Sequence, residues 1–279
     1  MTLKKAYKTL IITIILMMLT IIFYALGVSR LALQWGMIGF VISAVLSVFS
    51  IVLSIHTTKH EQEILKVSFL SKRKFEILDW FTFLSVSLMA IFIIFMFIVL
   101  PSDVKHSSMM PTLKEGERIL IYHFNYEPET EDIIILKMTK ENYSLVPDSM
   151  YIERDSQGNI KRIHDVIYFV KRLKASPGDL IEFVNYNILK EQYEVSVNGV
   201  VILTPQNEPY YVMQNQKEII ELSLDQGILK AGLYLAFGDN ANGYLSYPAS
   251  FDSRSFGAVF EEDIVGKAIF KLWPIGKVE

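Results

Sequence analysis

Three long apolar segments dominate the first hundred residues of the chain. The stretches 9–29, 31–55 and 80–102 contain no charged residue. A helix needs about 20 residues to cross the hydrocarbon core of a bilayer, and each stretch is long enough. Inside lipid, backbone N–H and C=O groups must pair within their own segment, as they do in a helix. The pattern therefore predicts three transmembrane helices, at 9–29, 31–55 and 80–101. A buried or re-entrant helix is the alternative for one of the first two.

The basic residues around these segments predict their orientation. The connector between the first two segments carries only Arg30, whereas the other basic residues precede the first segment or separate the second from the third: Lys4, Lys5, Lys8, Lys59, Lys66, Lys72, Arg73 and Lys74. Short loops rich in Lys and Arg stay in the cytoplasm. We therefore expect a cytoplasmic tail at 1–8, a basic cytoplasmic loop at 56–79, and an extracytoplasmic domain at 102–279. The protein would be a multi-pass protein of the plasma membrane.

The remaining residues, 102–279, follow a different pattern. Short runs of β-branched and aromatic residues are separated by turn residues such as Asn198-Gly199 and Pro177-Gly178-Asp179, which is typical of strands. The runs lie at 118–123, 132–136, 166–170, 193–197 and 233–237. Long amphipathic helical periods are scarce, so we predict a mainly-β domain with room for a short helix.

Composition and charge agree with this division. The chain is 51% hydrophobic and its mean hydropathy is +0.32, which is high for a soluble domain. Residues 1–101 carry a net charge of +5 and residues 102–279 a net charge of −8. An acidic domain lacks the basic surface that nucleic acid requires, so we expect no nucleic-acid partner. The absence of cysteine excludes disulfides, thiolate metal sites and a cysteine nucleophile.

Two polar residues of the second region are unremarkable when taken alone. Ser108 lies in a polar turn just after the third apolar segment, where serine is usually a turn residue. Lys171 follows the apolar run 166–170, where a lysine usually marks a solvated strand end.

Four segments together change this interpretation, because they resemble the sequence boxes of type I signal peptidases and follow one another in that family's order. They are residues 106–113 (HSSMMPTL), 116–121 (GERILI), 168–179 (YFVKRLKASPGD), and 238–240 (GDN) followed by 250–254 (SFDSR) and Gly257. The resemblance implies a mainly-β catalytic domain of the signal peptidase type. It also implies a membrane-bound serine endopeptidase that removes N-terminal signal peptides from exported preproteins, so that its partners are signal peptides and the lipid bilayer.

The resemblance also implies roles for individual residues. Ser108 matches the nucleophile, Lys171 the general base, and Ser250 the hydroxyl that orients the lysine. Met109 matches a residue beside the substrate pocket. The backbone N–H of Ser108 would be one oxyanion donor.

Two acidic/basic pairs match residues that support the site in the family, namely Asp252 with Arg254 and Asp239 with Arg172. The chain also departs from the family pattern. It has His106 where the family often has Ser or Gly, Ala175 in place of Gly, and Ala241 in place of Arg, and the interval from 240 to 252 is about six residues longer than usual.

The chemistry of these roles is coherent. A serine hydroxyl is a weak nucleophile unless a neighbouring base takes its proton. A lysine can be that base only when neutral, and its ordinary pKa near 10.4 must therefore be lowered, which burial achieves. The apolar neighbours Phe169, Val170 and Leu173 are candidates for the surroundings of Lys171.

Other interpretations stay open. The same fold can serve as a catalytically weak or inactive factor for surface-protein or pilus assembly, and a self-cleaving regulator is a third class. His56 and His60 are four residues apart but lack the Glu of a zinc-protease motif. The acidic loop 127–132 lacks the spacing of a calcium loop. We expect no metal and no cofactor.

Overall fold

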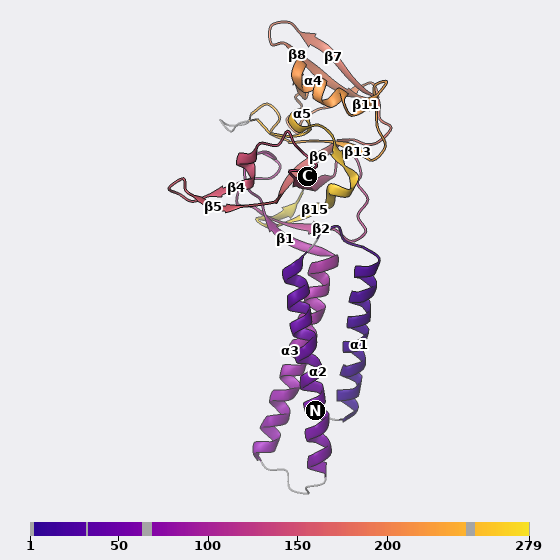
Figure 1. Cartoon of the computed structure of the whole chain (residues 1–279), viewed down its shortest axis with the longest axis vertical. Helices are drawn as coiled ribbons and strands as arrows, with labels where there is room; N and C mark the ends of the chain where they lie inside the picture. The colour runs from indigo at the N-terminus through magenta and orange to yellow at the C-terminus, as the bar shows by residue number, and fades with distance from the viewer. Residues whose placement is uncertain (1–2, 32, 63–68, 244–248, 279) are drawn as a thin grey trace. The chain divides into compact units, whose positions relative to one another are not determined.

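The computed structural model of the chain describes residues 3–31, 33–62, 69–243 and 249–278. The chain divides into two compact units, Met1–Leu100 and Pro101–Glu279. The first unit is helical, and the second contains mainly strands (Figure 1).

Within the described residues, the first unit contains three helices that are long and apolar enough to cross a membrane. They are α1 (Leu3–Ala25), α2 (Gln34–Gln62) and α3 (Phe69–Phe97). The prediction of three apolar helices is confirmed, although α1 begins and ends earlier than predicted. The segment 56–79 is partly helical, because α2 and α3 extend into it from both sides. Lys66 lies outside the described residues, as do the side chains of Lys59, Lys72 and Lys74.

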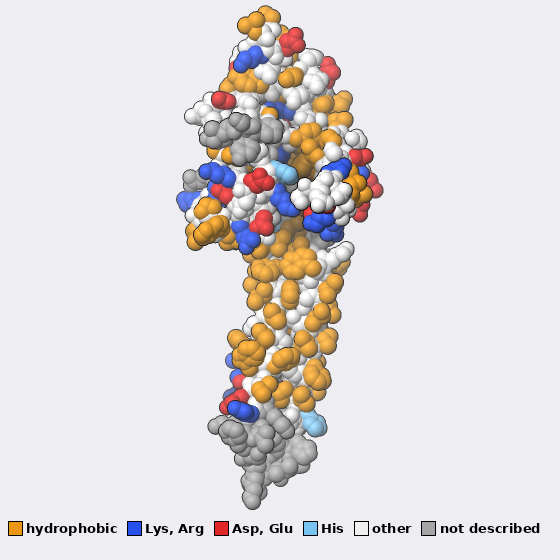
Figure 2. Space-filling view, turned by 90° about the vertical axis from the view of Figure 1, so that its left-hand side faces the viewer, with side chains coloured by type: hydrophobic (Ala, Val, Ile, Leu, Met, Phe, Trp, Pro, Cys, Tyr) orange, Lys and Arg blue, Asp and Glu red, His pale blue; other side chains and the backbone are white. Residues whose placement is uncertain are grey.

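The surface and the interior of the helical unit differ in chemistry. Figure 2 shows hydrophobic side chains covering most of the visible face of the helices. In the interior, buried hydroxyl groups join the helices: Thr13 Oγ1 of α1 lies 3.0 Å from Ser47 Oγ of α2, and Thr82 Oγ1 of α3 donates to Ser50 Oγ of α2 at 3.0 Å. In lipid, close packing and such hydrogen bonds associate helices, because burial of apolar surface gives no advantage there.

The second unit is built on a sheet that, among the described residues, has eight strands in the order β1-β2-β15-β3-β6-β13-β14, with β16 paired to β15. Their bounds are β1 (Val99–Asp103), β2 (Arg118–Tyr122), β3 (Ile133–Thr139), β6 (Val166–Ala175), β13 (Leu233–Phe237), β14 (Val259–Phe260), β15 (Ile264–Trp273) and β16 (Ile275–Lys277).

Smaller sheets and short helices complete this unit, and Figure 1 shows the β4–β5 and β7–β8 hairpins projecting from it. The remaining strands are β4 (Ile152–Arg154), β5 (Ile160–Ile163), β7 (Ile181–Asn187), β8 (Gln192–Val197), β9 (Val200–Val201), β10 (Tyr211–Met213), β11 (Leu224–Asp225) and β12 (Ile228–Leu229). The helices are α4 (Gln214–Glu221), α5 (Ser253–Phe256) and the short 3-10 turns η1 (Asp148–Tyr151) and η2 (Glu261–Asp263).

The five predicted strands are confirmed as β2, β3, β6, β8 and β13, and the mainly-β fold with them. β6 runs five residues beyond its predicted end, to Ala175. Asn198 and Gly199 form the turn between β8 and β9, with φ of 53° and 79°. This left-handed pair is the geometry that two-residue hairpin turns favour.

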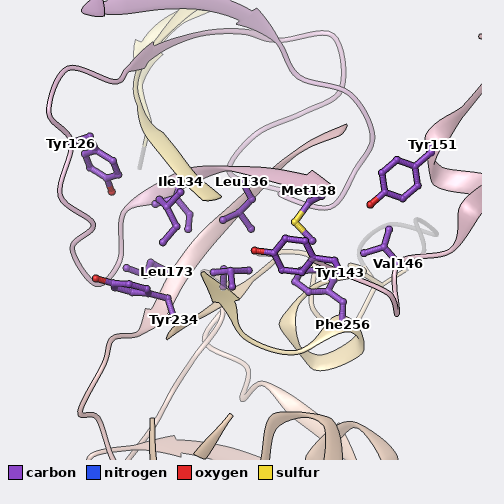
Figure 3. Packing of buried hydrophobic residues seen from close by; sticks show 13 residues of the cluster. Tyr126, Ile134, Leu136, Met138, Tyr143, Val146, Tyr151, Leu173, Tyr234 and Phe256 are labelled. Carbon is purple, nitrogen blue, oxygen red and sulfur yellow. The ribbon is translucent and has the colours of Figure 1, made fainter. Parts of the chain in front are cut away.

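An apolar cluster packs on one face of the main sheet (Figure 3). Ile134, Leu136 and Met138 alternate along β3, and Leu173 extends from the neighbouring β6. Paired residues of neighbouring strands share a face of the sheet. Ile134 pairs with Lys171, so the register directs the Lys171 side chain toward this apolar face.

Candidate active site

The segment that carries Ser108 follows β1 and is mostly buried. Ser107, Met109, Thr112 and Leu113 are each less than one-tenth exposed, whereas Ser108 is half-buried. The backbone turns on itself here, since Leu113 N donates to Met109 O at 2.8 Å. The fold therefore presents the Ser108 side chain at the edge of an otherwise buried turn.

Lys171 lies on β6 and is 3% exposed. Its Nζ lies 5.3 Å from the centre of the Phe169 ring. Phe169 and Leu173 are two residues away on the same strand and share its face, whereas Val170 lies on the opposite face. Two of the three predicted apolar neighbours therefore lie on the face of the sheet that carries the amine, and Phe169 lies close to it.

Burial lowers the pKa of Lys171 from 10.5 to about 8. The carboxylate of Asp252 opposes this change, Arg254 adds to it, and Asp239 opposes it more weakly. Desolvation disfavours the charged ammonium, and the nearby carboxylates only partly compensate. A lysine with this pKa is neutral in a substantial fraction of molecules near pH 8.

Gly238 is the point at which the segments of the site meet. Phe237 pairs with Arg172, so continuing the register by one residue places Gly238 across from Lys171. A Cβ on Gly238 would lie 2.0 Å from Ser250 Oγ and 2.6 Å from the carbonyl oxygen of Ser108. That Cβ would lie on the face that carries the Lys171 side chain. The close approach of Ser108 and Ser250 to this backbone thus requires glycine and brings both toward Lys171.

Asn240, two residues after Gly238, binds the backbone of the Ser108 segment and the backbone of Ser250. Its N–H donates to Ser108 O at 3.0 Å, its Nδ2 donates to Ser107 O at 3.2 Å, and its C=O accepts from Ser250 N at 2.8 Å. The sequence predicted no role for Asn240 or Gly238, and the signal that marks them is their place in the GDN motif.

Both predicted ion pairs are formed. Arg254 binds Asp252 through Nε and Nη2, each at 2.8 Å, and Arg172 binds Asp239 through the same two atoms, each at 2.8 Å. Such bidentate pairs fix geometry as well as charge. Their role in catalysis stays a prediction.

Asp252 connects its pair to the site. Its Oδ2 accepts a hydrogen bond from Gly238 N at 2.9 Å. Burial by itself would raise the pKa of Asp252, but the charge and hydrogen bonds of Arg254, the N–H of Gly238 and the charge of Lys171 outweigh it and hold the pKa below its usual value. Asp252 is therefore ionised and anchors the start of the GDN segment.

Ser250 and Lys171 both have unused hydrogen-bonding capacity. Ser250 Oγ is buried and has no hydrogen-bond partner in the part of the chain that the structure describes. Lys171 Nζ makes no hydrogen bond to any described residue either. The predicted contact between Ser250 and Lys171 is thus not formed here and stays a prediction. Residues 244–248, in the lengthened interval, lie outside the described residues.

Three further positions complete the predicted set. Met109 is 1% exposed, and its role beside a substrate pocket stays a prediction. His106 is exposed and has φ of 66°, a conformation that non-glycine residues seldom adopt. Ala241, where the family has Arg, is buried, and its carbonyl accepts from Arg254 Nη1 at 3.2 Å.

Three apolar helices followed by a mainly-β unit, which contains a buried lysine of lowered pKa and a half-buried serine, are typical of membrane-anchored serine peptidases. The family described as signal peptidase, peptidase S26, matches residues 77–273, which include every predicted site residue. The chain belongs to this family of signal peptidases.

Relatives agree with this assignment. "Signal peptidase IB" of Staphylococcus aureus (strain COL) is 28% identical over 220 residues, which cover 73% of this chain and 93% of that protein. "Thylakoidal processing peptidase 1, chloroplastic" of Arabidopsis thaliana is also 28% identical, over 181 residues that cover 64% of this chain and 43% of that protein. The chain is a membrane-anchored serine endopeptidase, and these similarities favour the peptidase over the assembly factor.

Proposed function

We propose that this signal peptidase cleaves signal peptides from exported preproteins with Ser108 as nucleophile and Lys171 as general base. The convergence at Gly238 is the observation that carries the proposal. It brings the backbone of Ser108 and the hydroxyl of Ser250 to the sheet position opposite Lys171. The lowered pKa of Lys171 supplies the neutral amine that the reaction needs.

The chemistry follows from this arrangement. Neutral Lys171 accepts the proton of Ser108 Oγ as that oxygen attacks the carbonyl carbon of the scissile bond. The resulting ammonium then gives the proton to the leaving amine, and an ester on Ser108 remains. Lys171 next takes a proton from water, which hydrolyses the ester and restores the serine.

Neighbouring groups serve this cycle. The N–H of Ser108 makes no hydrogen bond within the described residues, so it can donate to the oxyanion that develops on the substrate. In this proposal the buried hydroxyl of Ser250, which has no hydrogen-bond partner among the described residues, orients the Lys171 amine. The pairs Asp252–Arg254 and Asp239–Arg172 hold the GDN segment and β6 in register beneath these groups.

We further propose that the catalytic unit lies on the extracytoplasmic side of the membrane. The support is the distribution of basic residues, which are concentrated in the first turns of α1 and around the connection from α2 to α3, including the adjoining ends of those two helices. A preprotein presents its cleavage site on that side after translocation, so this orientation gives the enzyme access to it.

The direct test is processing of a preprotein by purified full-length variants. Ser108→Ala and Lys171→Met should each abolish cleavage, and the double variant should be hardly slower than either single one, because the two groups act as one unit. Ser107→Ala is a matched control, because the hydrogen bonds from Asn240 and Met110 to Ser107 use its backbone oxygen, which the substitution keeps. Cleavage by Ser108→Ala at the wild-type rate would contradict the assignment of Ser108 as nucleophile, whereas a purified wild-type protein that cleaves no preprotein would favour the assembly factor.

A further inference from the structure

Thr112 is bound to two different parts of the fold, once through its side chain and once through its backbone. Its side-chain hydroxyl donates to Asp239 Oδ2 at 2.5 Å, and its carbonyl oxygen accepts from Lys271 Nζ at 2.5 Å. Thr112 is only four residues from Ser108 and is 7% exposed. The position of this peptide therefore helps to determine that of the nucleophile.

Lys271 reaches Thr112 from a different part of the sheet. It lies on β15, where it pairs with Ile119 of β2. Its Nζ also lies 3.3 Å from Glu117 Oε2, and the side chains of Lys271 and Glu117 are 17% and 10% exposed. Glu117 Oε2 in turn accepts from Lys114 N at 3.2 Å. One ammonium group thus connects the nucleophile segment to the turn that follows it.

These contacts hold both ends of the nucleophile segment, residues 108–112. At one end, Asn240 donates to Ser108 O. At the other end, the Thr112 hydroxyl donates to Asp239, the residue before Asn240, and Lys271 donates to the Thr112 carbonyl oxygen. A charge-assisted hydrogen bond from an ammonium to a carbonyl is stronger than a neutral one. Lys271 is therefore well placed to stop this end of the segment from moving.

We propose that Lys271, with Glu117, is a positioning residue that keeps Ser108 Oγ within reach of Lys171. The proposal rests on the proposed function of Ser108. Lys271 contacts the turn that carries the nucleophile and not the reacting atoms, so it acts through Thr112. A displacement of about 1 Å at a nucleophile can lower a rate by about 100-fold, and the contact matters for that reason.

Kinetics of the full-length protein with a synthetic preprotein test this role. Lys271→Met keeps most of the side-chain stem and removes the charge and the donor. We expect kcat to fall by about 10- to 100-fold with KM changed by less than about threefold. Lys271→Arg should recover most of the rate, because its guanidinium can serve both Thr112 and Glu117. The pH at which activity declines should not move, because Lys271 does not contact Lys171.

Lys267→Met is the matched control. Lys267 lies on the same strand and is paired with Asp132 at 3.2 Å, away from the nucleophile segment. We expect its kcat to equal that of the wild type. All rates should be measured well below the melting temperature of each variant, so that a loss of folded protein is not read as a loss of kcat.

Three results would overturn the role of Lys271. They are a kcat for Lys271→Met equal to that of Lys267→Met, a loss confined to KM, and a failure of Lys271→Arg to recover the rate. If Lys271→Met does not fold, the test uses Glu117→Gln instead. We expect this variant to lose kcat several-fold, and an unchanged kcat would contradict the proposal. Ser108→Ala is measured in parallel. An inactive Ser108→Ala beside a fully active Lys271→Met removes only the role of Lys271, whereas an active Ser108→Ala removes the proposed function itself.

Discussion

The amine of Lys171 is buried in the β unit, and with Lys171 as the proposed general base its pKa should set the pH range of activity. Because only the neutral amine can accept the Ser108 proton, kcat/KM should rise with pH and level off above the pKa of about 8. We expect this acid limb in assays from pH 6 to 10 with a preprotein whose own ionisation does not change over that range. An acid limb near pH 10 would show that Lys171 is an ordinary solvated lysine.

The same pKa makes a prediction about stability. The pKa of Lys171 is lowered on folding, so between about pH 8 and 10.5 the unfolded chain binds more protons than the folded one. Stability should therefore rise with pH through this window, and the cost of burying the ammonium is fully present below it. Lowering the pKa of Lys171 from 10.5 to about 8 corresponds to about 3 kcal/mol in the free energy of unfolding.

Lys171→Met removes the buried charge and fills the same space with an apolar side chain. It should raise the melting temperature at pH 7 and have little effect above pH 10.5, as measured by thermal unfolding of the full chain in detergent. A lower melting temperature at pH 7 would mean that the Lys171 amine stabilises the fold, contrary to the burial argument.

Gly238 gives a steric prediction at the same scale. In Gly238→Ala the new methyl group would lie 2.0 Å from Ser250 Oγ and 2.6 Å from Ser108 O, so the nucleophile segment must shift. We expect a loss of kcat of at least about 100-fold. Gly276→Ala is the control, because a Cβ there meets no atom within 4 Å and should leave kcat unchanged. Equal activity of the two variants would contradict the convergence at Gly238.

At the scale of elements, the signals that succeeded were local ones. Alternating apolar residues and turn pairs such as Asn198-Gly199 predicted five strands, because side-chain period and turn geometry depend on residues close in sequence. The other strands were not predicted, among them the ten-residue β15, the seven-residue β7 and the β4–β5 hairpin. β5 is exposed along its whole length, so it lacks the apolar alternation that marks a half-buried strand.

Contacts between distant segments could not be predicted in the same way. The hydrogen bond from Lys271 to Thr112 joins residues 159 positions apart, and the one from Asn240 to Ser107 joins residues 133 positions apart. The resemblance to signal peptidases supplied candidates such as Ser108 and Lys171, because a motif records long-range proximity that a single sequence does not. Lys271 belongs to no such motif, and only the packing of β15 reveals its contact.

The helical unit gives a prediction about packing between elements. Thr13 Oγ1 and Ser47 Oγ are 3.0 Å apart, and both residues are fully buried. The chain contains no cysteine, so Thr13→Cys with Ser47→Cys should give one intramolecular disulfide on oxidation, because the two side chains are close enough for its geometry. A mobility shift on a non-reducing gel measures it.

The control for this pair moves one residue along α1. Ile14 is 47% exposed, and the next residue of a helix points about 100° away. Ile14→Cys with Ser47→Cys should therefore stay reduced. Equal oxidation of both pairs would show that α1 does not pack on α2 through this face.

At the scale of the whole molecule, charge is divided between the two units. The first 101 residues carry +5 and the rest −8. Apart from Arg30, the basic residues of this part of the chain lie near the start of α1 or in the stretch that includes the end of α2, the connection to α3 and the start of α3. Basic short segments resist translocation, whereas a long domain such as the β unit crosses the membrane largely regardless of its charge.

Cysteine labelling in intact cells tests the orientation that follows. Glu127 lies in the acidic loop of the β unit, Arg73 lies near the start of α3, and both are exposed. Since the chain has no cysteine of its own, Glu127→Cys and Arg73→Cys each provide a single thiol. A membrane-impermeant maleimide should label Glu127→Cys in intact cells and label Arg73→Cys only after the membrane is permeabilised, because basic short segments remain in the cytoplasm.

Labelling of both after permeabilisation shows that each thiol is reactive, and normal preprotein processing shows that each variant is folded. The reverse pattern, with Arg73→Cys labelled from outside, would place the catalytic unit in the cytoplasm and separate Ser108 from preproteins that have already crossed the membrane.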